Sequence, residues 1–191
     1  MANVDRPNGF RPVKHLSGAP YNGAFSKYYS GTDNLFMGDL VEISATGLAN
    51  GSGAYPECAR AEADDIVIGA VVGWEVDPAS PSRLYHAASS TYAVYVADAP
   101  DLIFMAQTND AGLAAADVGL NCDFVVAAGS TTSGVSNMEV DGGTEATTQA
   151  EPLKLMGMVN SPDNEVGVAN MKVLVMINQH SYNNEAGTTG I

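Results

Sequence analysis

Turn-forming residues interrupt this sequence at short intervals, and this feature constrains the fold more than any other. The chain has 191 residues, of which 20 are Gly and 9 are Pro. Clusters of Gly, Pro, Asn and Asp favour turns and disfavour the interior of helices. The segments between these clusters are short and rich in Val, Ile and aromatic residues, as is typical of strands. The sequence therefore predicts an all-β chain.

The segment 66–76 is the clearest strand candidate. It is a β-branched run with two internal glycines, which indicate a bend or a bulge. A period of two places Val72, Trp74 and Val76 on one face, so that if Trp74 faces the core, the two valines do too. Further strands are predicted at 35–43, 92–96, 102–107, 121–126, 153–159 and 171–178, and a hairpin with its tip at 141–143 between 136–140 and 144–151.

Together these segments predict a compact β-barrel or sandwich of about seven to nine short strands. At most one or two short helices are expected, and the only helix candidate of any size is 109–118, with Asn109 or Asp110 as its cap. The length suits one ordinary domain. We therefore expect residues 31–191 to form a single β-rich domain.

Residues 1–30 differ from the rest in charge. They carry a net charge of +3, whereas residues 31–191 carry a net charge of −17. Three prolines restrict the residues before them to extended conformations, so this stretch is predicted to be an extended, basic N-terminal arm. The alternative is a disordered, solvated tail, but the apolar content of the segment favours an arm that lies on a partner subunit. The candidate contact residues of the arm are Arg6, Phe10, Arg11, Val13, Lys14, Tyr21 and Phe25.

The overall composition excludes several classes of function. The formal net charge is −14, with 8 Lys and Arg against 22 Asp and Glu. Binding to nucleic acid or to an anionic membrane needs clustered basic residues, so neither partner is expected. No apolar run reaches the length of a membrane span, and no signal peptide is recognised, so synthesis in a cytoplasm is expected. Cys58 and Cys122 are predicted to be buried free thiols.

No motif for catalysis, for a cofactor or for a metal is found. Phosphate-binding glycine loops, zinc-binding His-Glu-x-x-His and the Gly-x-Ser-x-Gly elbow are all absent. The histidines are the isolated residues His15, His86 and His180. A small hydrolase remains an alternative only if the fold brings a histidine within hydrogen-bond reach of a Ser or Cys and a carboxylate. The sequence otherwise predicts a protein that is not an enzyme.

Several short motifs together resemble the capsid cement, or head decoration, proteins of tailed bacteriophages. The resemblance spans most of the chain as a pattern of turns and strands. It rests on Arg6-Pro7-Asn8-Gly9-Phe10-Arg11-Pro12-Val13, Gly18–Gly23, Gly38-Asp39-Leu40-Val41, Ala61–Ile66, Ile68–Gly73, Tyr95–Pro100, Gln107, Val118-Gly119, Gly134-Val135-Ser136 and Val173–His180.

This resemblance implies a structural protein on the outer face of a virion capsid. Its partners would be the major capsid protein and further copies of itself, most often in a homotrimer, and it would stabilise the shell by bridging neighbouring capsid subunits. The alternative is another β-rich virion component, of a tail or a fibre. Proteins of that kind usually show repeats or long shaft segments, and none is visible here.

Overall fold

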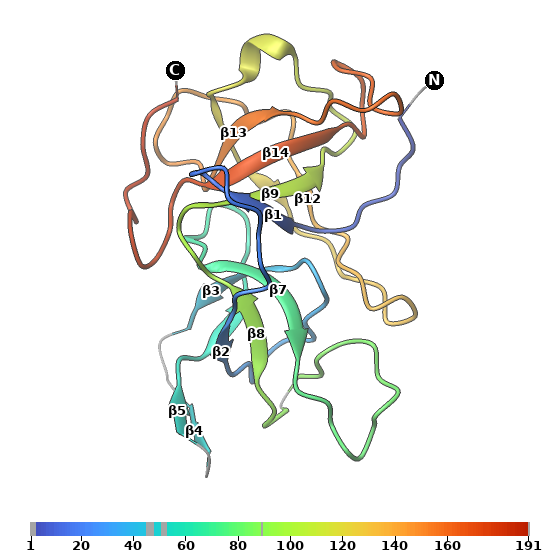
Figure 1. Ribbon diagram of the computed structural model, residues 1–191, viewed down its shortest axis with the longest axis vertical. Helices are drawn as coiled ribbons and strands as arrows, with labels where there is room; N and C mark the ends of the chain where they lie inside the picture. The colour runs from blue at the N-terminus through green and yellow to red at the C-terminus, as the bar shows by residue number, and fades with distance from the viewer. Residues whose placement is uncertain (1–2, 45–47, 51–52, 89, 191) are drawn as a thin grey trace.

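The computed structural model describes residues 3–44, 48–50, 53–88 and 90–190 (Figure 1). Antiparallel strands dominate this part of the chain, so the predicted all-β class is confirmed. Strands β1 to β14 exceed the expected seven to nine because several of them have only two or three residues. A single 3-10 turn, η1 (Ala115–Asp117), is the helical element of the described residues.

Two five-stranded sheets form the body. The first sheet has the order β1 (Arg11–His15), β9 (Leu102–Gln107), β14 (Lys172–Ile177), β13 (Leu153–Met158) and β10 (Asn121–Cys122). The second has the order β2 (Ser26–Tyr28), β8 (Val94–Ala97), β7 (Gly69–Trp74), β3 (Leu40–Ile43) and β6 (Cys58–Arg60). Two small pairs complete the fold: β4 (Leu48–Asn50) with β5 (Gly53–Tyr55), and β11 (Phe124–Val125) with β12 (Glu139–Val140).

The main core joins the two sheets, which lie one above the other along the long axis in Figure 1. Leu40, Ala70 and Ala97 of the second sheet belong to the same buried cluster as Leu102 and Phe104 of the first. The opposite face of the second sheet packs in a separate cluster, which includes Tyr28, Leu35, Val41, Cys58, Ile68, Val71, Val94 and Val96. The second sheet is therefore buried on both faces. Cys58 and Cys122 are buried free thiols, as predicted.

The period-of-two prediction for Val72, Trp74 and Val76 is wrong. The pairing of β7 with β8 shifts register between Val71 and Gly73, as expected for a β-bulge. The extra residue places Val72 against the main core and Trp74 against the separate cluster. Val76 lies beyond the strand and is 61% exposed. The two glycines indicate the bulge correctly, and the bulge interrupts the alternation on which the prediction depends.

The structure also contradicts the prediction that the N-terminal segment is a separate arm. Residues 11–15 form β1 and pair with β9, while residues 26–28 form β2 and pair with β8. Phe10 is fully buried and makes an edge-to-face contact with Phe124, with ring centroids 6.4 Å apart. The segment is extended, but it contributes one edge strand to each sheet because its apolar residues find partners within the chain.

Two local predictions fail for tertiary reasons. Only 115–117 of the expected helix 109–118 is helical. Leu113 is buried, its carbonyl accepts a hydrogen bond from Gly167 N, and a Cβ on Gly112 would lie 2.6 Å from the backbone of Gly167, so packing overrides helix propensity. The hairpin expected around 141–143 does not form, because β12 pairs with β11 and Ala146 forms an isolated bridge with Asn121.

Candidate functional site

The outer face of the first sheet is the candidate site. Residues that are direct partners in adjacent antiparallel strands point to the same face of a sheet. One row across the sheet is Lys14, Ile103, Met176 and Lys154, and the next is Arg11, Met105, Leu174 and Gly157. Lys172 and Gln107 continue this face. The alternate residues, such as Phe104, Val173 and Val175, belong to the core.

This face combines an apolar centre with basic margins. Met105, Leu174 and Met176 are half-buried, and a Cβ on Gly157 would meet no atom within 4 Å, so the face is open at that position. Basic residues stand at β1 on one side and at β13 on the other. With Arg6, which lines the same groove as Arg11 and Lys172, five of the eight basic residues of the chain lie here. We call this surface the basic face.

The basic residues outside this face are neutralised, whereas most of those on it are not. The three outside residues form ion pairs: Lys27 with Glu75 at 2.7 Å, Arg60 with Glu62 at 3.6 Å and Arg83 with Asp77 at 3.5 Å. On the basic face, Lys172 pairs with Asp163 at 2.6 Å. Within the described ranges, Arg6, Arg11, Lys14 and Lys154 have no carboxylate partner.

Partial burial makes these unpaired cations costly for the isolated chain. Burial lowers the pKa of Arg11 and also that of Lys154 below their ordinary values. A shift in this direction means that desolvation disfavours the charged form and that no nearby carboxylate compensates. An anionic group placed beside Arg11 or Lys154 would offset this cost, because an opposite charge favours the charged form of each side chain.

A groove of about 740 Å³ lies at one end of the basic face. Its lining includes Arg6, Arg11, Met105, Gln107, Lys172 and Asp163. Residues 4–11 form one wall, and the ends of β9 and β14 contribute to the floor. Cavities of this size accommodate ligands that make several contacts at once.

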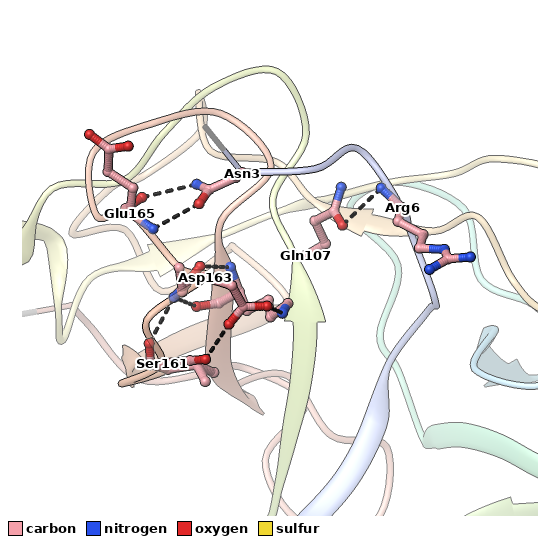
Figure 2. A network of polar contacts seen from close by, with 9 residues as sticks. Asn3, Arg6, Gln107, Ser161, Asp163 and Glu165 are labelled. Atoms are coloured by element: carbon pink, nitrogen blue, oxygen red, sulfur yellow. Dashed lines mark hydrogen bonds and ion pairs between the residues drawn. The ribbon is translucent and has the colours of Figure 1, made fainter. Parts of the chain in front are cut away.

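Side-chain hydrogen bonds hold the N-terminal wall in place (Figure 2). The Asn3 amide donates to the carbonyls of Glu165, Val168 and Ala169 at 2.9–3.2 Å and accepts from the Glu165 N–H at 2.7 Å. Arg6 N–H donates to the Gln107 side-chain oxygen at 3.1 Å, and Figure 2 shows its guanidinium directed away from Gln107. The wall is thus anchored at both points while the Arg6 side chain stays available.

The outer edges of the first sheet are covered by the chain itself. On β1, Val13 O accepts a hydrogen bond from Tyr21 N–H, and His15 N–H donates to Ala19 O. On β10, Asn121 exchanges backbone hydrogen bonds with Ala146. Covered edges do not template the addition of another strand. At these positions the edge strands of the first sheet are therefore already paired within the chain.

The residues predicted for the arm divide into three groups. Phe10 is in the core and cannot contact a partner. Arg6, Arg11 and Lys14 belong to the basic face. Val13 is 40% exposed on β1, Tyr21 packs partly against the main core, and Phe25 is 48% exposed and stacks on Tyr95 with ring centroids 4.4 Å apart.

The strand residues of this face are not indicated by any sequence motif. They are Ile103, Met105, Lys154, Lys172, Leu174 and Met176. Their strands were predicted at close to the correct positions. The alternation in 172–177 carried a weak signal, because Lys172 shares its parity with Leu174 and Met176. Only the pairing order of the strands shows that these residues join those of β1.

The histidines do not form a catalytic constellation with the described residues. His15 Nδ1 lies 2.9 Å from Asp101, His86 Nε2 lies 3.0 Å from Tyr92 O, and His180 Nε2 lies 3.1 Å from Asp98 O. Across these ranges no histidine hydrogen-bonds a Ser or Cys side chain. Burial raises the pKa of Cys58 and Cys122 to about 12. Both thiols are therefore protonated at neutral pH.

The described residues also lack two other kinds of feature. They contain no group of three or more His, Cys, Asp or Glu side chains placed to hold a metal ion. No helix in this part of the chain is both long and apolar enough to cross a membrane.

Several of the motifs that carry the family resemblance contact one another at the turn before β3. Gly9 and Gly38 both have positive φ, and a Cβ on Gly9 would lie 2.5 Å from Gly38 O and 2.7 Å from the Ser136 side chain. Phe10 N–H donates to Gly38 O, and Ser136 N–H donates to Met37 O. These motifs therefore fix the N-terminal segment to the turn before β3.

A raised carboxyl pKa beside the groove predicts a pH-dependent stability. Burial, and then the nearby charge of Asp5, raise the pKa of Glu139 to about 7, and burial raises that of Asp39 to about 6. The folded state thus binds protons more tightly than the unfolded state, so its stability falls as pH rises through these values.

We expect the free energy of unfolding to fall by no more than about 1 kcal/mol between pH 6.5 and 8. Below pH 6.5 the buried His86 and His180, whose pKa values are lowered by burial, oppose this trend. Denaturant unfolding at several pH values measures the slope. Glu139→Gln is expected to remove most of it, and a stability that rises over this range would contradict the assignment.

Comparison of the chain with protein-family models, with curated proteins and with solved structures finds no match in any of the three.

Proposed function

We propose that this chain is a structural protein of a tailed-bacteriophage virion that binds the outer surface of the capsid as a cement or decoration protein. The observation that carries the proposal is the basic face: the Lys and Arg side chains that lack a carboxylate partner among the described residues of this strongly acidic chain lie on one partly apolar sheet face and on the segment beside it. Such a face serves binding rather than turnover. The motif pattern that resembles decoration proteins supports the capsid as the partner.

In this proposal the basic face attaches to acidic and apolar surface of the major capsid protein. The acidic remainder of the chain points away from the shell. A protein that binds the assembled shell, and not its separated subunits, stabilises the shell by mass action. Copies that each bridge two capsid subunits add to this effect through effective concentration. Self-association into a trimer is part of the proposal, and light scattering on the purified protein tests it.

Particle rupture tests the cementing role. Particles that carry the protein are expected to rupture at a higher temperature than particles that lack it, while both have the same geometry. Added salt is expected to reduce the difference, since exposed charges are screened. The measurement is the rupture temperature across a salt series. Equal rupture temperatures at low salt would remove the cementing role.

A further inference from the structure

The groove at the end of the basic face has the features of a peptide-binding site. It holds about 740 Å³ and is bordered on one side by residues 4–11, of which 4–10 precede β1 and have no regular secondary structure. Its lining includes the cations Arg6, Arg11 and Lys172 and the single anion Asp163, which is already paired with Lys172. Among the residues that line the groove, the cations outnumber the anions. Asp5 and Glu139 lie next to the groove, where they accept hydrogen bonds from the side chain of the lining residue Gln107 at 3.5 and 3.2 Å.

The two arginines are free to bind an anion. In the described part of the chain the Arg6 guanidinium has no hydrogen-bond partner. The Arg11 guanidinium bonds only to Asn8, with Nη2 2.5 Å from the Asn8 side-chain oxygen and Nε 3.2 Å from Asn8 O. A guanidinium has five N–H donors in a planar fork that matches a carboxylate. Most of these donors are unused here.

The main chain of the wall is also available. Between residues 4 and 8, its hydrogen bonds to the other described residues are those from Arg6 N–H to Gln107 and from Arg11 to Asn8 O. An extended peptide can be bound by such free N–H and C=O groups, with side-chain pockets adding specificity. Apolar contact is offered by Met105 in the groove and by Val4, which is 73% exposed.

We propose that this groove binds an extended acidic segment of a partner protein, with Arg6 and Arg11 pairing with its carboxylates and Met105 contacting its apolar side chains. A peptide fits better than a nucleic acid, because a long polyanion would be repelled by the net charge of −14. This inference rests on the proposed function, since it names the chemistry that the basic face recognises on the capsid partner.

Fluorescence anisotropy with a labelled peptide tests the inference directly. The probe is an octapeptide of alternating Glu and Leu, compared with the same peptide carrying Gln in place of Glu and with a 20-nucleotide single-stranded DNA. The full-length protein is expected to bind the Glu peptide about tenfold or more tightly than the Gln peptide, because charge-assisted hydrogen bonds to arginine are lost in the latter.

Matched variants locate the binding. Arg6→Gln with Arg11→Gln is expected to weaken binding of the Glu peptide about tenfold or more, whereas Lys27→Gln with Arg83→Gln removes the same charge elsewhere and is expected to leave it unchanged. Thermal unfolding of each variant confirms that it is folded. Equal affinity for the Glu and Gln peptides, an equal loss in both double variants, or tighter binding of the DNA would overturn the inference.

Peptide binding measured together with co-sedimentation of the protein with capsids separates this inference from the proposed function. If the protein binds the Glu peptide through Arg6 and Arg11 but does not bind capsids, the groove is a peptide site and the capsid role is wrong. If it binds capsids but not the peptide, the capsid role stands and the groove is not the recognition site.

Discussion

Replacing Phe10 with alanine is expected to destabilise the protein by about 3–5 kcal/mol, the usual cost of removing a buried phenylalanine side chain. Phe10 is fully buried in the main core, contacts the Phe124 ring edge to face, and donates its backbone N–H to Gly38 O at 2.8 Å. A separate arm would make the same substitution nearly neutral. Denaturant unfolding measures the difference.

Phe25→Ala is the matched control, because it removes the same side chain from the same segment. Phe25 is 48% exposed and contacts Tyr95 at the surface. We expect this change to cost about 1 kcal/mol. Equal effects of the two substitutions would contradict the placement of residues 1–30 in the body. Deletion of residues 1–24 removes β1 together with Phe10 and is therefore expected to unfold the chain.

Gly69→Ala is the second substitution with a large expected effect. Gly69 starts β7, and a Cβ there would lie 2.2 Å from Ala97 O and 2.9 Å from Val96 Cγ1. These neighbours belong to β8, which is paired with β7 in the middle of the second sheet, so the strands must move apart. We expect a loss of about 3 kcal/mol in the free energy of unfolding.

Gly157→Ala is the control for this prediction. Gly157 also lies within a strand, β13, but a Cβ there would meet no atom within 4 Å. Its φ is not positive, so alanine is accommodated without strain. The control is expected to be neutral or slightly stabilising, by about 0.5 kcal/mol. A similar loss at both positions would show that the close approach of β7 and β8 is not the cause.

Local patterns in the sequence identified most of the long strands. The runs at 102–107, 153–159 and 171–178 correspond closely to β9, β13 and β14. The composition of these runs is sufficient to predict strands, because short β-branched and apolar segments between turn-forming residues favour strands over helices. The class of the fold followed from the same signal.

Local patterns do not predict which strands pair when the strands are far apart in the sequence. Nothing local in the sequence indicates that β1 pairs with β9, which lies about ninety residues away along the chain, so the sequence predicts an arm for residues 1–30. Because of the bulge in β7, Trp74 lies on the face of the sheet opposite to Val72, and not on the same face as the alternation predicts. The basic face needs the order β1, β9, β14, β13, since its residues come from four strands that share no local motif.

The proposed role of the basic face is tested most directly by co-sedimentation with empty capsids. The protein is expected to sediment with the capsids, and Arg6→Glu with Arg11→Glu is expected to reduce the bound fraction strongly. Lys27→Glu with Arg83→Glu changes the net charge by the same four units on residues that are ion-paired outside the basic face, and is expected to bind like the unmodified protein. Equal binding of the two double variants, or no sedimentation of the unmodified protein with capsids, would contradict the account.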